Sequence, residues 1–163
     1  MTLTFGKSAP GDILAKAQRD HARLESAEAS EESEAMSDAL FDLAVGLTSL
    51  KDWLKMHSSP TVMSTDVEQY WNSSVALSSF RDFANAGKHR LITRYNPNTI
   101  DALTSASNMP LTVFETVAKV LGRGKKYPRL KIIRGDGSRY RAVDLGRSAI
   151  GECQTFMTKH GIA

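Results

Sequence analysis

The chain has 163 residues, of which 41% are hydrophobic and 24% are charged, and its formal net charge is +3. This composition predicts a single globular domain, residues 1–163, and the lack of an apolar run of about 18 residues argues against a membrane-spanning protein. Cys153 is the only cysteine, which excludes an internal disulfide and predicts a core residue of a cytoplasmic protein.

Helical periodicity dominates the first third of the chain. Residues 1–10 show no sustained period and are expected to form an arm, and Asp12 is a candidate cap for a first helix that reaches about Ala27. Ser33 begins the second helix, whose apolar residues alternate steps of four and three: Met36, Leu40, Leu43, Leu47, Leu50 and Leu54. This seam favours one helix of an intramolecular bundle over a coiled-coil partner. Pro60 ends the helix.

Ser64 or Thr65 is a candidate cap for a third helix, which is predicted to run to a break at Tyr95–Asn98, so that residues 11–95 hold three bundle helices. Its packing face is mainly aromatic and comprises Val67, Tyr70, Trp71, Leu77, Phe80, Phe83 and Leu91.

The pattern changes to β-structure in residues 111–143. Leu130–Arg134 and Arg139–Val143 flank an Asp-Gly turn and predict an antiparallel hairpin. Val113–Leu121 is expected to add a third strand, although a short helix also fits. Asp144 is a candidate cap for a last helix over residues 144–160. The predicted fold is therefore mainly α, a bundle of about four helices with a small hairpin or three-stranded meander before the C-terminal helix.

The stretch from Arg81 to His89 concentrates chemically versatile side chains at the end of the third helix. At about 100° per residue, Asp82, Asn85 and His89 share one face, opposite the apolar stripe. One interpretation of this polar face is an ordinary solvated helix surface. The other is a network in which Asp82 and Asn85 bond to neighbouring helices and hold His89, with Asp52 of the second helix as a further partner.

Two strings of residues resemble a known group. Asp82, Asn85, Lys88 and His89 match the Asp-x-x-Asn-x-x-Lys-His signature of uncharacterised bacterial proteins related to the HEPN superfamily of helical-bundle domains, and Leu50–Trp53 resembles that group's Leu-x-Asp-Trp helix. The resemblance implies a helical bundle with an RNA-directed role, of the defence or toxin–antitoxin type.

Catalytic HEPN members carry an Arg and a His that are separated by four to six residues. The resemblance implies that Arg81 would stabilise the phosphorane charge and that His89 would act as general acid or base on an RNA hydroxyl. Seven residues separate the two here. Two non-catalytic alternatives are therefore open, namely the polar network and a site for a small anion at Lys88, His89 and Arg90.

The C-terminal third carries most of the positive charge. Residues 122–147 hold nine Lys and Arg against two Asp, a net +7, which leaves −4 for the rest of the chain. Candidate nucleic-acid contacts on this segment are Lys125, Lys126, Arg134, Arg139 and Arg141. Edge strands also carry Lys and Arg merely to prevent aggregation.

The candidate partners are RNA, a protein and a second copy of the chain that would form a homodimer. No membrane, cofactor or metal is expected, because the four His lie far apart without ligand spacing. Two functions remain open. One is a HEPN-like, RNA-directed protein, and the other is a non-enzymatic bundle that binds a protein partner or a small anionic ligand.

Overall fold

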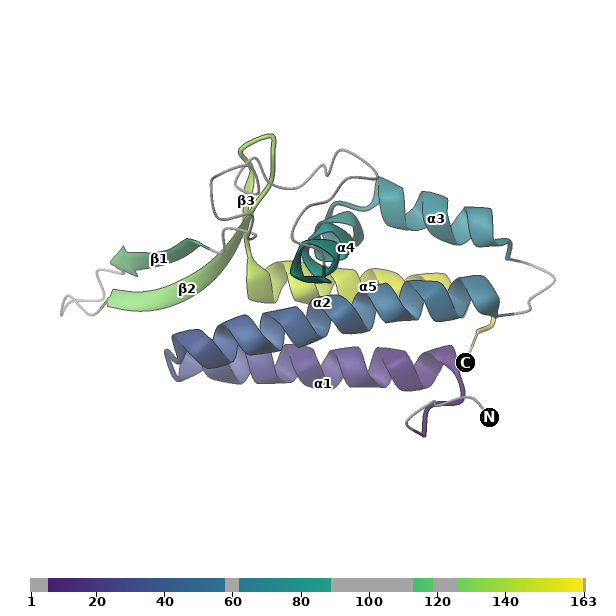
Figure 1. Cartoon of the computed structure of the whole chain (residues 1–163), viewed down its shortest axis with the longest axis horizontal. Helices are drawn as coiled ribbons and strands as arrows, with labels where there is room; N and C mark the ends of the chain where they lie inside the picture. The colour runs from purple at the N-terminus through teal and green to yellow at the C-terminus, as the bar shows by residue number, and fades with distance from the viewer. Residues whose placement is uncertain (1–5, 58–61, 89–112, 119–125, 163) are drawn as a thin grey trace.

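The computed structural model describes residues 6–57, 62–88, 113–118 and 126–162, which form five helices and one three-stranded sheet (Figure 1). The elements in chain order are α1 (Pro10–Ala29), α2 (Ser33–Met56), α3 (Ser64–Ser73), α4 (Val75–Lys88), β1 (Val113–Ala118), β2 (Lys126–Ile133), β3 (Arg139–Arg141) and α5 (Ala142–Lys159). The predicted mainly helical class, with a small antiparallel sheet before the last helix, is confirmed.

The long helices α1 and α2 lie side by side and form the base of the bundle in Figure 1. Helix α5 runs along the same pair, α4 crosses over α2, and α3 lies farther out beside the C-terminal half of α5. The sheet projects from the end of the bundle at which α5 begins. None of the helices in the described part of the chain is both long and apolar enough to cross a membrane.

The leucine seam of α2 lies at the centre of the core. All six apolar residues of the predicted seam are at most 1% exposed, and the fully buried Trp71 and Phe80 join them from α3 and α4. Cys153 is also fully buried, as predicted, and burial raises the pKa of its thiol well above the usual value. Removal of this apolar surface from water is the main force that holds the helices together.

Three helices begin earlier than the sequence predicts, so none of the predicted cap residues is a cap: Asp12, Ser64 or Thr65, and Asp144. Helix α1 begins at Pro10, where proline's missing N–H costs nothing, and α5 begins two residues before Asp144. The Asp12 carboxylate still accepts hydrogen bonds from the N–H groups of Ser8 and Ala9, at 2.8 and 3.2 Å, and these bonds lower its pKa. Acidic side chains in the first turn of a helix also stabilise it, although they are not cap residues.

The single third helix predicted for the region up to residue 95 is wrong, because two helices meet there. Ser74 has an extended backbone (φ −84°, ψ 129°), and its hydroxyl accepts a hydrogen bond from the N–H of Leu77 at 3.0 Å. Ser74 is therefore the N-cap of α4. The polar run Asn72–Ser74 was the available signal for this break. The change of direction sends α4 across α2.

The sheet has the order β1-β2-β3 with both pairs antiparallel, so the strand alternative for Val113–Ala118 is confirmed. Residues 119–121, the rest of that predicted segment, lie outside the described residues. The turn between β2 and β3 places Gly137 at φ +81°, and Arg134 donates its backbone N–H to the carbonyl of Ser138 at 3.0 Å. A glycine suits this left-handed conformation because it lacks a side chain.

Candidate functional site

The polar face of α4 contains a buried ion pair. Asp82 is 0% exposed, and its Oδ1 accepts hydrogen bonds from Nε and Nη2 of Arg81 at 2.9 and 2.7 Å. Arg81 also donates through Nη1 to the amide oxygen of Asn72, across the break between α3 and α4. A buried carboxylate must be paired with a cation to remain charged, and here two nitrogens of the Arg81 guanidinium, Nε and Nη2, hold Asp82 while the third holds Asn72.

These contacts decide how Arg81 can act. Its side chain is 12% exposed, and its described partners are a neighbour on the same helix and a residue of the preceding helix. A guanidinium held in this way fixes the joint between α3 and α4. Its attraction for an external phosphate is reduced, because the Asp82 carboxylate already neutralises the charge of the guanidinium.

The other members of the predicted network divide into two groups. Asn85 lies half-buried one turn beyond Asp82, whereas Asp52 is exposed on α2, so the structure does not bring Asp52 to the buried pair. Lys88 ends α4, but its side chain, His89 and Arg90 lie outside the described residues. The pairing of Arg81 with His89 and the anion site at residues 88–90 therefore stay predictions.

Arg134 connects the hairpin to α4. Its Nη1 donates to the carbonyl oxygen of Val75 and to the hydroxyl of Ser79, both at 3.0 Å. The side chain is only 11% exposed. An arginine predicted to contact nucleic acid therefore lies against the first turn of α4, where a backbone carbonyl and a hydroxyl of that helix hold its guanidinium.

Arg141 joins the hairpin to α1. Its Nη2 lies 2.6 Å from Oε2 of Glu28, and its Nη1 lies 3.3 Å from Oδ2 of Asp144. Arg139, the third hairpin arginine, is exposed. Lys125 and the side chain of Lys126 lie outside the described residues. Part of the positive charge of residues 122–147 is thus neutralised within the molecule.

The interface of α1 with α5 contains polar residues that sequence reasoning did not identify. His21 is 7% exposed, and its Nε2 lies 2.8 Å from the carbonyl oxygen of Val143. One turn on, Glu25 accepts a hydrogen bond from Nη2 of Arg147 at 2.7 Å, which lowers the pKa of Glu25. The spacing of His21, Glu25 and Glu28 by four and three residues was the available signal, since it places all three on one helix face.

Asp20 is a buried carboxylate of α1. It is 4% exposed and accepts hydrogen bonds from Lys16 at 2.6 Å and from Arg23 at 2.7 Å.

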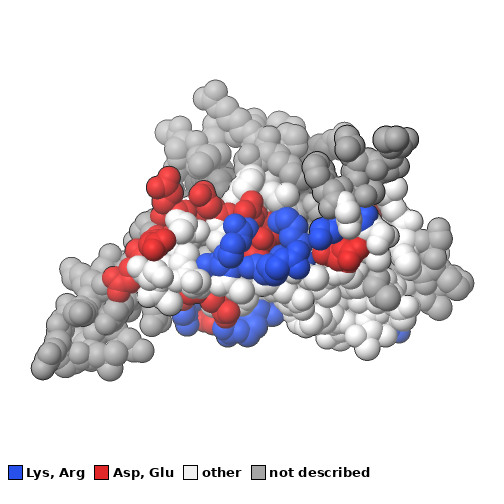
Figure 2. All heavy atoms as spheres, turned by 90° about the horizontal axis from the view of Figure 1, so that it is seen from below, with Lys and Arg blue, Asp and Glu red and all other residues white. Residues whose placement is uncertain are grey.

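Figure 2 views the molecule from the side on which α1 lies, and it shows Lys and Arg side chains in the middle of the face with Asp and Glu around them. This face of the described residues is a mixed surface and lacks the continuous basic patch expected of a nucleic-acid site.

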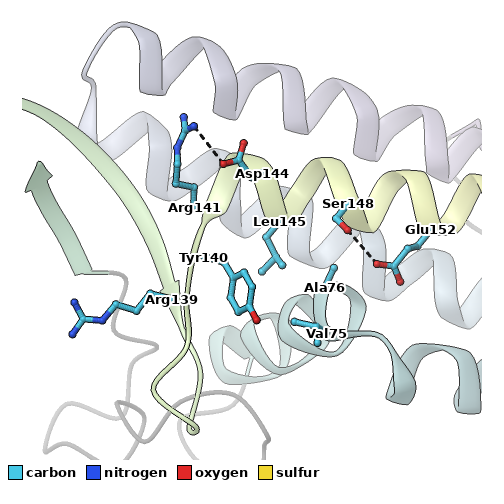
Figure 3. Close-up of a pocket in the computed structure, with 9 residues that line it drawn as sticks. All are labelled: Val75, Ala76, Arg139, Tyr140, Arg141, Asp144, Leu145, Ser148 and Glu152. Carbon is cyan, nitrogen blue, oxygen red and sulfur yellow. Dashed lines mark hydrogen bonds and ion pairs between the residues drawn. The ribbon is translucent and has the colours of Figure 1, made fainter. Parts of the chain in front are cut away.

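An open cavity of about 550 Å³ lies between β3, the start of α4 and α5 (Figure 3). Its apolar lining comes from Val75, Ala76, Tyr140 and Leu145. Its polar and charged lining comes from Arg139, Arg141, Asp144, Ser148 and Glu152. The volume falls within the range of small-molecule sites, and five of the nine lining residues are polar or charged.

Two polar groups in the cavity lack a partner within the described part of the chain. Ser148 donates its hydroxyl to Oε1 of Glu152 at 3.2 Å, which leaves Oε2 of Glu152 without a hydrogen bond there. The hydroxyl of Tyr140 likewise makes none, and Figure 3 shows it directed toward Val75 and Ala76. The cavity therefore holds unused hydrogen-bonding capacity, in contrast to the α4 pair.

The described residues contain no group of three or more His, Cys, Asp or Glu side chains that could hold a metal ion. Comparison of the chain with protein-family models, with curated proteins and with solved structures finds no match. The resemblance to HEPN proteins therefore remains a prediction, as do the bacterial origin, the homodimer and the cytoplasmic location.

Proposed function

We propose that this protein is a non-enzymatic helical-bundle protein that binds a small ligand in the cavity between β3, α4 and α5. One observation carries the proposal. The described polar side chains of the α4 motif are used in structural contacts, whereas the cavity exposes a carboxylate oxygen and a hydroxyl that have no partner in the described residues. Small-molecule sites in proteins combine a preformed apolar cavity with such polar groups.

The small anionic ligand expected from residues 88–90 has less support than a ligand in this cavity. The guanidinium of Arg141, which lines the cavity, is shared between Glu28 and Asp144. An anion would have to compete with both carboxylates for that charge. The ligand proposal is therefore tied to the cavity.

A HEPN-like, RNA-directed function is the second candidate, and one observation favours it. Arg81 lies on α4, which ends at Lys88, immediately before His89, and Asp82 holds its guanidinium in one orientation. The resemblance implies that RNA cleavage of this type uses an arginine and a histidine four to six residues apart, and here seven residues separate them.

RNA binding and cleavage separate the two functions. The purified protein is incubated with single-stranded and hairpin RNA at 20 mM and 200 mM salt, and both bound fraction and cleavage products are measured. The ligand-binding proposal expects no cleavage above a buffer control and no binding that weakens steeply with salt. Cleavage that disappears in Arg81→Lys, a variant that keeps the charge, would overturn it in favour of the second candidate.

A further inference from the structure

The charges that line the cavity indicate the class of ligand it takes. We propose that it binds an organic cation, namely a primary amine attached to an apolar or aromatic body, with Glu152 as counter-ion. This assignment rests on the proposed ligand-binding function and specifies its ligand. It depends on which charged groups of the cavity already have a partner of opposite charge.

The positive charges of the cavity are directed away from Glu152. Arg141 points toward Asp144 in Figure 3, and it is paired with both Asp144 and Glu28. The Arg139 side chain extends to the opposite side of the strand from Tyr140. Asp144 in turn has two arginine partners, since Nη1 of Arg147 also lies 3.4 Å from its Oδ1. The charges of Arg141 and Asp144 are therefore paired with each other and with neighbouring residues, although Nε of Arg141 makes no hydrogen bond within the described residues.

Glu152 lies at the other end. It stands eight positions after Asp144 on α5, which corresponds to about 12 Å along the helix axis. The carboxylate is half-buried, and its described hydrogen-bond partner is the neutral hydroxyl of Ser148. No cation of the described residues neutralises it. A primary ammonium would do so through a charge-assisted hydrogen bond to Oε2.

The rest of the cavity selects the body of the ligand. The ring of half-buried Tyr140 faces Leu145 and the first turn of α4, where Val75 is 44% exposed although it is apolar. An apolar or aromatic body would cover these side chains and remove them from water, and the Tyr140 ring offers its face to a nearby cation. The cavity thus fits an amine with an apolar body better than a sugar or a nucleotide.

Three probes with one phenylethyl body isolate the role of the charge: 2-phenylethylamine, 2-phenylethanol and 3-phenylpropionate. Each is titrated into the full chain at pH 7, with binding followed by calorimetry and by backbone-amide NMR shifts. The variants are Glu152→Gln, which keeps the shape and the bond from Ser148, and Glu34→Gln. Glu34 is exposed on α2, far along the chain from the cavity residues, so its substitution makes the same change of charge at a control position.

The expected result is that the amine binds best, with shifts at Tyr140, Leu145 and Ser148, and that Glu152→Gln weakens it by about three- to tenfold while Glu34→Gln does not. Preference for phenylpropionate or phenylethanol would overturn the ligand class and leave ligand binding in the cavity intact. An equal effect of both variants, or shifts away from the cavity, would also overturn the assignment. Failure of all three probes to bind would overturn it together with the proposed ligand-binding function.

Discussion

The polar cluster of α4 and the cavity beside β3 both gather charged side chains, but they use them differently. In α4 the carboxylate of Asp82 is fully buried against the guanidinium of Arg81. In the cavity the carboxylate of Glu152 is half-buried beside a neutral hydroxyl. A concentration of versatile residues in a sequence therefore does not by itself mark a functional site. What matters is whether each group already has a partner in the fold.

The largest effect is expected from breaking the α4 pair. Asp82→Ala leaves the guanidinium of Arg81, which is 12% exposed, without its buried carboxylate. We expect the free energy of unfolding to fall by about 3–5 kcal/mol, because removing one partner of a buried ion pair strands the other. Urea denaturation followed by circular dichroism measures this loss. A decrease below about 1 kcal/mol would show that the pair is a surface feature.

The interface between α5 and α1 should be the next most sensitive to substitution. A Cβ on Gly146 would lie 2.7 Å from Cδ2 of His21 and 3.0 Å from Cδ2 of Leu43. Gly146→Ala is therefore expected to destabilise the protein by about 1–3 kcal/mol.

Gly151→Ala, in the same helix, is the matched control for this prediction. A Cβ at position 151 would meet no atom within 4 Å, so the better helix propensity of alanine should stabilise the protein by up to about 1 kcal/mol. Thermal melts of both variants check the pair. If both changes shift the midpoint in the same direction, the close approach of α5 to His21 is contradicted.

The ion pair between the hairpin and α1 should contribute less than the α4 pair. Arg141 is 35% exposed, while the Glu28 side chain is 12% exposed and has one oxygen, Oε1, without a partner. Arg141→Met should cost about 1–2 kcal/mol, because it leaves a mostly buried carboxylate unpaired. The double variant Arg141→Met, Glu28→Gln should recover part of this loss. A double variant less stable than either single change would argue against the pair.

The smallest effect on stability is expected in the cavity. Glu152→Gln and Tyr140→Phe remove a charge and a hydroxyl that have no partner in the described residues, so each should change the unfolding free energy by no more than about 0.5 kcal/mol. Chemical denaturation of both variants checks this. A loss above about 1.5 kcal/mol for either would show that the group is structural, as Asp82 is.

Repeating local patterns made much of the fold predictable from the sequence. The seam from Met36 to Leu54 and the Asp136-Gly137 turn specify a buried helix and a hairpin through spacing and turn chemistry alone. The break at Ser74 was missed because the apolar pattern continues across it. A cap consists of one hydroxyl and one N–H, which leave little trace in periodicity.

The site was harder to predict because its members meet through tertiary packing. Glu152 was not singled out, since a glutamate on a helix is common. The pairing of Arg141 with Glu28 joins residues 113 positions apart, which no local pattern indicates. The adjacency of Arg81 and Asp82 was visible, but their burial depends on how α4 crosses the bundle.

A double-mutant cycle on Arg81 and Asp82 tests the central claim that the α4 motif is structural. The unfolding free energies of the parent, Arg81→Gln, Asp82→Asn and the double variant are measured under identical conditions. We expect the unfolding free energy of the double variant to be higher, by at least about 1.5 kcal/mol, than the sum of the two single losses implies. Losses that add within about 0.5 kcal/mol would contradict it, because the two side chains would then not act as one unit.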